Sequence, residues 1–76
     1  THPAGYSSWI DFWERKTGRK ANRCSCVSCI NKAAVGAHVK LVYGQNNWYI
    51  VPLCYAHNSI SSDFSVNSED LVPVNQ

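Results

Sequence analysis

The chain opens with an apolar pattern of helical period. In "SSWIDFWERKTG" the residues Trp, Ile, Phe and Trp at positions 9, 10, 12 and 13 give a short helix a large apolar side. Ser8 is suited to cap this helix, and Asp11 completes the pattern of a capping box. The acid lies near the start and the bases near the end, which suits the helix dipole, and Gly18 provides a stop. The pattern predicts an N-terminal helix over residues 6–18.

The pattern then changes to one typical of β-strands. Two runs rich in β-branched and aromatic residues, "VGAHVKLVY" and "WYIVPL", flank "GQNN", which has turn chemistry, so residues 35–53 are predicted to form a β-hairpin. Pro52 cannot donate to the ladder and should end the second strand or lie at its edge. "CYAHNSISS" predicts a short helix. In the tail, residues 63–76, "FSV" and "LVPV" could add edge strands or drape over the core.

The composition indicates one small ordered domain that needs a staple. The chain has 76 residues, of which 45% are hydrophobic and 16% charged. A core of this size gives little stability alone, so a metal or disulfides are expected. No apolar run reaches the roughly 20 residues that span a bilayer, and "THPAGYSS" has no features of a signal peptide. We therefore expect no membrane partner and a cytoplasmic location.

The net charge of +2 is small, but the basic residues are unevenly distributed. Five of the seven lie within nine positions: Arg15, Lys16, Arg19, Lys20 and Arg23. This segment could simply be a solvated helix end and loop. It could also contact the phosphates of DNA or RNA, which is the hypothesis that gives it a function.

The four cysteines fall into two groups that suit a metal. "PLCYAHN" offers Cys54 and His57 three positions apart, on one side of a helical turn. "RCSCVSC" offers Cys29 together with either Cys26, at C-x-x-C spacing, or Cys24, with four intervening residues. Both spacings lie within the range of structural zinc sites.

Disulfides are the alternative use of these thiols. Cys24 and Cys26 are too close in sequence to pair comfortably, and two bridges would leave His57 unexplained. The absence of a visible secretory signal also disfavours an oxidising compartment. The pattern therefore predicts a structural zinc ion, because tetrahedral sites rich in thiolates select zinc.

A zinc knuckle, a β-hairpin and a helix that supplies the last two ligands is the order of a treble-clef zinc finger. "GAHV" (36–39) and "YIVPLCYAHN" (49–58) resemble the two motifs of the HNH endonuclease core. The resemblance covers residues 24–62. It implies a small α+β fold, a zinc-stabilised treble clef (ββα) with an extra N-terminal helix and a tail packing on the core, so that residues 1–76 form a single zinc-binding domain.

The resemblance also implies catalytic positions. His38 would correspond to the general base and Asn58 to a ligand of a second divalent metal, present only if the chain is a nuclease. The family's central Asn falls at Tyr49, which departs from the pattern and points to a degenerate, non-catalytic form. In that form His38 would be a half-buried strand residue or a support near the zinc.

The spacing leaves the fourth zinc ligand open between Cys24 and Cys26. Local knuckle geometry favours Cys26, whereas similar small bacterial proteins with a "GAHV…WYIVPLC" signature carry "C-x-V-x-G-C", which points to Cys24. The resemblance favours Cys24, Cys29, Cys54 and His57 as the ligand set, with Cys26 as the spare thiol and as the alternative to Cys24.

Three functions follow as hypotheses. The first is a non-catalytic HNH-like zinc module that contacts nucleic acid. The second is a zinc module that docks a protein partner through Trp9, Trp13 or Trp48. The third is a divergent metal-dependent HNH nuclease using His38.

Overall fold

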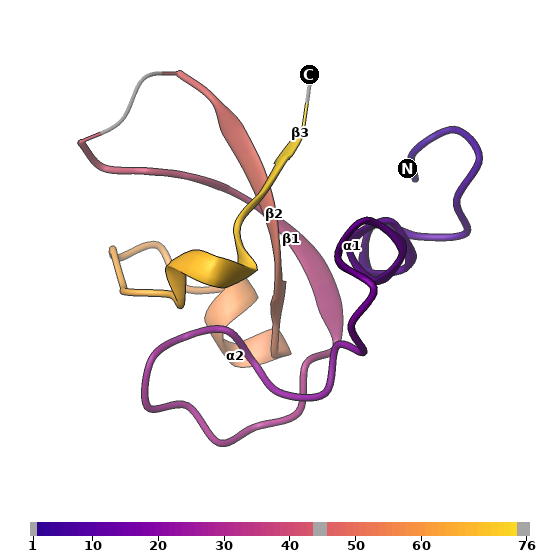
Figure 1. The fold of residues 1–76 in the computed structure, drawn as a ribbon. Coiled ribbons are helices and arrows are strands. Elements are labelled where there is room, and N and C mark those ends of the chain that lie inside the picture. Colours follow the sequence, from indigo (N-terminus) through magenta and orange to yellow (C-terminus); the bar gives the residue numbers. More distant parts are fainter. Residues whose placement is uncertain (1, 44–45, 75–76) are drawn as a thin grey trace.

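The computed structural model describes residues 2–43 and 46–74 as a small α+β domain. Its elements are helix α1 (Trp9–Thr17), strands β1 (Val35–Lys40) and β2 (Trp48–Leu53), helix α2 (Tyr55–Asn58), the 3₁₀ turn η1 (Ser68–Asp70) and strand β3 (Val72–Val74). The three strands form one antiparallel sheet in the order β1-β2-β3. Helix α1 lies beside the sheet, and α2 follows directly from the end of β2 (Figure 1).

Helix α1 is shorter than the predicted range of 6–18. Ser8 has an extended backbone, with φ −166°, and its Oγ accepts a hydrogen bond from the Asp11 amide at 3.0 Å. The helix therefore begins after Ser8, because a capping residue lies outside it. The Asp11 carboxylate accepts from the Ser7 amide rather than from Ser8, which differs from a full capping box. Gly18 ends the helix with φ 71°, as predicted.

Neither helix in the described residues is long and apolar enough to span a membrane.

The predicted hairpin is confirmed, with Val35 opposite Leu53 and Lys40 opposite Trp48. Its turn, predicted over 44–47, lies partly outside the described residues. Strand β3 pairs only with residues 48–50 of β2. At Pro52, β2 therefore has a neighbouring strand on the β1 side alone. A proline is tolerated there because its missing N–H faces no neighbouring strand. Of the tail's two apolar segments, "LVPV" supplies the edge strand β3.

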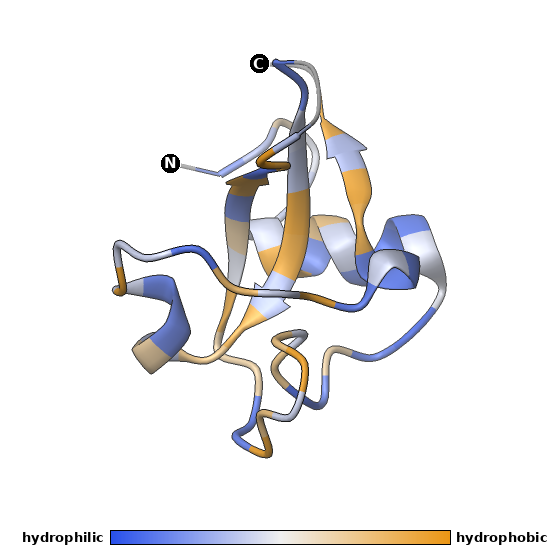
Figure 2. Cartoon of the chain, turned by 90° about the vertical axis from the view of Figure 1, so that its left-hand side faces the viewer, coloured by the Kyte–Doolittle hydropathy of each residue, from blue (hydrophilic) through white to orange (hydrophobic). Residues whose placement is uncertain are grey.

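The sheet separates two small apolar clusters, as the two-residue period of its strands requires. On one face Ala37, Val51 and Leu53 pack with the cysteines of the loop before β1. On the other face Ile50 packs with Phe12 of α1 and with further residues of α1 and β3. Hydrophobic residues run along the strands in Figure 2. The core is therefore divided, and β2 contributes to both halves.

Gly36 allows α1 to lie directly on β1. A Cβ atom built on Gly36 would come within 2.5 Å of the carbonyl carbon of Trp9 and 2.6 Å of the amide nitrogen of Ile10. Real Cβ atoms do not approach backbone so closely. The position therefore requires glycine for close approach, although its backbone conformation would accept other residues.

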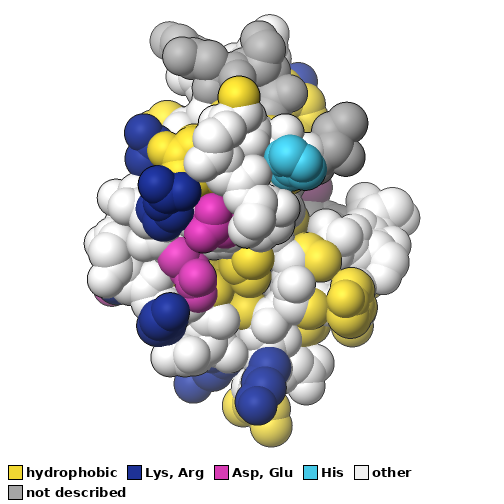
Figure 3. Space-filling model, turned by 90° about the vertical axis from the view of Figure 1, so that its right-hand side faces the viewer, with side chains coloured by type: hydrophobic (Ala, Val, Ile, Leu, Met, Phe, Trp, Pro, Cys, Tyr) yellow, Lys and Arg dark blue, Asp and Glu magenta, His cyan; other side chains and the backbone are white. Residues whose placement is uncertain are grey.

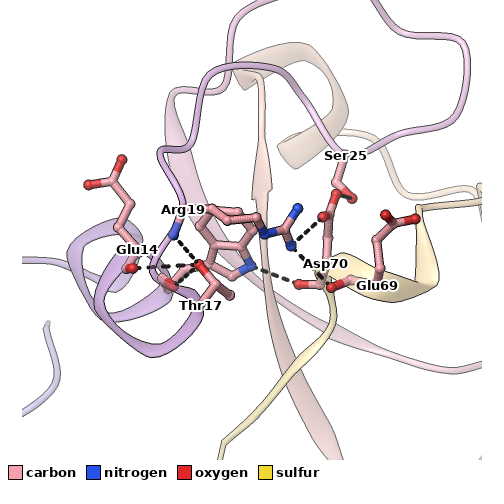
Figure 4. Close-up of polar contacts among 7 residues, drawn as sticks. Glu14, Thr17, Arg19, Ser25, Glu69 and Asp70 are labelled. Carbon is pink, nitrogen blue, oxygen red and sulfur yellow. Dashed lines mark hydrogen bonds and ion pairs between the residues drawn. The ribbon is translucent and has the colours of Figure 1, made fainter.

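A polar joint ties three distant segments together at Asp70 (Figure 4). The Asp70 carboxylate accepts from Ser25 Oγ and from the Arg19 guanidinium, each at 2.8 Å. The backbone carbonyl of Asp70 accepts from the Trp13 indole N–H at 2.7 Å. Ser25 and Trp13 are 1% and 2% exposed, so these bonds satisfy polar groups that water does not reach. The joint fixes the loop before β1 against both α1 and the tail.

Candidate metal centre

The first half of the site is a tight loop between residues 23 and 32, which we call the knuckle. It is closed at its base by a hydrogen bond from the Cys24 amide to the Asn31 carbonyl, 2.9 Å. At its tip the Cys29 amide donates to the Cys26 carbonyl at 3.1 Å, and Ser28 adopts φ 71°. This turn points the chain back so that Cys24 and Cys29 face the same side.

The second half is the start of α2. Cys54 is the N-cap residue of this four-residue helix, and its carbonyl accepts from the Asn58 amide at 3.0 Å. Because side chains three positions apart meet on one side of a helical turn, His57 returns over Cys54. The His57 Nδ1 atom lies 3.2 Å from Cys54 Sγ.

The two halves meet in a cluster that could hold a metal ion. One ligand atom from each of Cys24, Cys29, Cys54 and His57 can be chosen so that all four lie within 4.8 Å of one another. The Cys29 and Cys54 sulfurs are 3.9 Å apart, and Cys24 Sγ lies 3.7 Å from His57 Nδ1. Zinc–sulfur bonds of about 2.3 Å in a tetrahedron put sulfurs about 3.8 Å apart. The four ligand atoms are therefore close enough to hold a metal ion after small side-chain adjustments.

The fourth thiol, Cys26, lies outside this cluster. Its Sγ contacts the Val27 carbonyl at 3.7 Å, and its backbone forms a bridge with Val66 of the tail. Burial raises the pKa of the Cys26 thiol, so it stays protonated at neutral pH. All four cysteines are free, which disfavours the disulfide alternative. The geometry brings Cys24, and not Cys26, to the cluster.

The thiols of the cluster are held in unequal environments when no ion is bound. The His57 backbone N–H, and then its side chain, lower the pKa of Cys54 to about 6. Burial raises the pKa of Cys24 to about 11. Cys54 is thus largely a thiolate at neutral pH, whereas Cys24 needs a nearby cation to lose its proton. Such a set binds a metal with release of protons.

Two neighbouring side chains support the cluster from outside. The Asn31 side-chain amide donates to Cys54 Sγ at 3.7 Å, and the His57 ring packs against Phe64 at a centroid distance of 5.4 Å. Outer contacts of this kind orient metal ligands. The sequence analysis did not single out either residue. The one feature of the sequence that could have pointed to Asn31 as a neighbour of the cluster is its position two residues after Cys29.

His38 lies away from the cluster. It follows Ala37 on β1 and stands opposite Ile50, so its side chain is on the face of the sheet that carries α1. The imidazole is exposed and packs edge-to-face on the Trp9 indole, with centroids 4.4 Å apart. This partial desolvation lowers the pKa of His38 below 6.5. The side chain is neither half-buried nor beside the cysteines, as the supporting role would require.

Asn58, the other catalytic candidate, is the exposed last residue of α2. In the described residues, the Cys3His cluster is the sole group of three or more His, Cys, Asp or Glu side chains close enough to hold a metal ion. Within the described residues, His38 therefore has no carboxylate and no second histidine close enough to bind a metal ion together with it. Residues 2–43 and 46–74 therefore offer no second group of this kind for the additional metal that the HNH resemblance implies.

The five predicted nucleic-acid residues are all exposed, but two of them have partners within the chain. Arg19 binds Asp70 and the Glu69 carbonyl, and Arg15 pairs with Asp11 at 3.7 Å. Figure 3 shows Lys and Arg side chains next to Asp and Glu on the face that carries α1. In the described part of the chain these two arginines make the ion pairs, and the other three basic residues, Lys16, Lys20 and Arg23, make none.

The three tryptophans differ in exposure. Trp13 is 2% exposed and belongs to the core, whereas Trp9 and Trp48 are partly exposed. Only the latter two could anchor a partner. Among the described residues the most exposed large apolar side chains lie elsewhere: Ile30 on the knuckle is 86% exposed, and Tyr43 after β1 is 100% exposed.

Comparison of the chain with protein-family models, with curated proteins and with solved structures finds no match. Its functional assignment therefore rests on geometry. What the geometry establishes is a small α+β domain, with a three-stranded antiparallel sheet and two helices, that carries a Cys3His cluster able to hold a metal ion.

Proposed function

We propose that the chain is a zinc-stabilised treble-clef module, HNH-like but non-catalytic, that contacts nucleic acid. The observation that carries the proposal is the cluster of four ligand atoms within 4.8 Å. Two ligands come from the knuckle before the hairpin, and two from the residues that follow it. That order supports the treble clef. Zinc suits the cluster because three thiolates and one imidazole select it over hard cations.

The nucleic-acid part of the proposal rests on the basic residues that remain available. Lys16, Lys20 and Arg23 are exposed and lack an ion-pair partner in the described residues. Arg19 also pairs with the buried Asp70, and Arg15 with Asp11 on the surface, so substituting either residue would remove an ion pair as well as a charge. A reducing compartment such as the cytoplasm would keep the thiols available for the metal.

Metal analysis of the purified chain tests the first part. One zinc per chain is expected, with loss of zinc in Cys54→Ser. A chain that carries no zinc, and gains no structure when zinc is added, would overturn the proposal.

Salt-dependent binding tests the second part. DNA or RNA binding at ~50 mM salt should weaken as salt rises, and the double variant Lys20→Gln, Arg23→Gln should lower the salt slope by up to about 2. The matched control is Lys32→Gln, a charge outside the predicted segment. Absence of binding at ~50 mM salt, where phosphate contacts are strongest, would refute the nucleic-acid part.

A protein-interaction role is the second candidate, favoured by one specific surface. A groove of about 390 Å³ lies between the end of β1 and the tail, lined by apolar residues such as Val39, Phe64 and Leu71. A peptide could occupy it. The nuclease alternative has less support because His38 lies against Trp9, on the face away from the cluster. Equal metal-dependent nicking by the native chain and by His38→Ala would exclude it.

A further inference from the structure

Aromatic side chains from three parts of the chain form a continuous row on the α1 side of the sheet. Tyr6 contacts Phe12 at 5.1 Å between centroids, Phe12 contacts Trp9 at 5.3 Å, Trp9 contacts His38 at 4.4 Å, and His38 lies 6.3 Å from Trp48. Every contact is edge-to-face, with interplanar angles between 72° and 79°. We call these five residues the aromatic strip.

The strip is held in place but not covered. Phe12 is buried and anchors it, whereas Tyr6, Trp9 and Trp48 are partly exposed and His38 is exposed. Because Gly36 lets α1 lie on β1, the Trp9 indole reaches the His38 ring. Edge-to-face packing orders the rings, and the partial exposure of Tyr6, Trp9 and Trp48 leaves part of each side chain in contact with solvent.

Positive charges accompany the strip along its length. The Arg15 guanidinium lies 4.8 Å from the Tyr6 centroid, Lys16 Nζ lies 5.6 Å from that of Phe12, and Lys40 Nζ lies 4.6 Å from that of Trp48. All three cations are exposed. Arg15 also pairs with Asp11, while Lys16 and Lys40 form no ion pair within the described residues.

Aromatic rings interleaved with cations match the chemistry of a single nucleic-acid strand. Unpaired bases stack on aromatic side chains, and phosphates contact Lys and Arg. Stacking of a base is stronger than an exposed cation–π contact, so a base can displace Lys40 from the Trp48 ring and leave the ammonium free for a phosphate. A duplex keeps its base faces covered and cannot bind in this way.

We propose that the aromatic strip binds single-stranded nucleic acid, with bases on Trp48, His38 and Trp9 and phosphates on Lys40 and Lys16. This proposal rests on the proposed nucleic-acid function and names its ligand class. The His38 ring supports it, because its lowered pKa leaves the imidazole uncharged at pH 7 and able to stack.

The test uses the zinc-loaded full chain with labelled ~20-nucleotide oligo(dT) and oligo(U), and a duplex of the same length, at ~50 mM salt. The single strands should bind more tightly than the duplex and should quench tryptophan fluorescence. His38→Ala and Trp48→Leu should each weaken single-strand binding by about 5- to 100-fold. Leucine keeps apolar bulk at position 48 but offers no ring, and His38 is exposed, so the fold should persist in both variants.

Tyr43→Ala is the matched control, since Tyr43 is a fully exposed aromatic outside the strip and its loss should leave affinity unchanged. If His38→Ala and Trp48→Leu bind like the native chain while the Lys20, Arg23 variant does not, the strip is refuted and the proposed function stands. Duplex binding that is as tight as single-strand binding also refutes the strip. If no nucleic acid binds, both proposals fail.

Discussion

Two neighbouring thiols, Cys24 and Cys26, have opposite fates although one residue separates them. Side chains two positions apart would share one side of a regularly extended chain, but here the backbone bends at Ser25 and turns after Cys26, where the Cys29 amide donates to the Cys26 carbonyl. Cys24 therefore reaches the Cys3His cluster, and Cys26 turns toward the Val27 carbonyl and the tail. The residue between them, Ser25, contacts Asp70. Spacing alone could not distinguish the two thiols, because both fit the rules for zinc knuckles.

Single substitutions should separate these thiols. Cys24→Ser removes a ligand, so we expect loss of bound zinc and unfolding, since structural zinc contributes on the order of 10 kcal/mol in small domains. Cys26→Ser should keep one zinc per chain and lose about 1 kcal/mol from the core. Metal content and far-UV circular dichroism measure both effects. Zinc loss in Cys26→Ser but not in Cys24→Ser would reverse the assignment.

Ser28 carries backbone strain at the knuckle tip. Its φ of 71° is the left-handed conformation, which costs a residue with a Cβ about 1–2 kcal/mol. Ser28→Gly should therefore stabilise the zinc-loaded chain by about 1 kcal/mol in urea denaturation. Ser28→Ala is the control, since it removes the hydroxyl but keeps the Cβ. An equal gain in both variants would contradict the explanation by strain.

At the scale of elements, the sequence predicted the types of structure better than their limits. The helix, the hairpin and the short helix after Cys54 all follow from local patterns, and the structure contains each. The predicted range 6–18 begins too early, because Ser8 caps the helix and Tyr6 packs on Phe12 from outside it. The packing of α1 on β1 through Gly36 could not be predicted, since nothing local reveals a partner.

Gly36→Ala should separate α1 from β1. The new methyl group would overlap the Trp9 backbone, and overpacking of this kind costs about 1–3 kcal/mol. Because α1 must move, the indole signals of Trp9 should shift in NMR spectra. Gly18→Ala is the comparison: its Cβ meets no atom within 4 Å, but its φ of 71° is unfavourable. It should cost about 1–2 kcal/mol without moving Trp9. A Gly36→Ala chain with unchanged Trp9 signals would contradict the close-packing argument.

At the scale of the whole molecule, the candidate metal site was the most predictable feature and the joint at Asp70 the least. Cysteine and histidine carry their chemistry in their identity, so their spacing predicts a metal cluster and leaves only the choice between Cys24 and Cys26 open. Arg19 and Asp70 are 51 positions apart, and a contact between them leaves no local pattern. For this reason Arg19 was predicted as a phosphate contact, and its ion pair with Asp70 was not foreseen.

Acid should dissociate the metal and destabilise the fold. In the metal-free cluster the pKa of Cys54 is about 6, below its ordinary value of 9.0. A group with a lowered pKa contributes stability that is complete above about pH 9 and is lost as the pH falls through about 6. Zinc binding follows the same direction because protons compete for its ligands. The melting temperature of the zinc-loaded chain should therefore fall between about pH 8 and about pH 5.

Chelation at about pH 8 is the control for this prediction. It should lower the melting temperature without a change in protonation, and zinc in excess should restore it. A melting temperature that is constant across this pH range in the zinc-loaded chain would contradict a thiolate site.

The joint at Asp70 has a consequence for synthesis on the ribosome. The Ser25 hydroxyl and the Arg19 guanidinium find their acceptor 45 and 51 residues further along the chain. The last residue of the Cys3His cluster is His57, so a metal ion could gather the four side chains while the tail is still being made. The nascent domain would then pass through two stages. First the knuckle is joined to the end of the hairpin, and then residues 68–74 close over Ser25 and fix α1 in its final position.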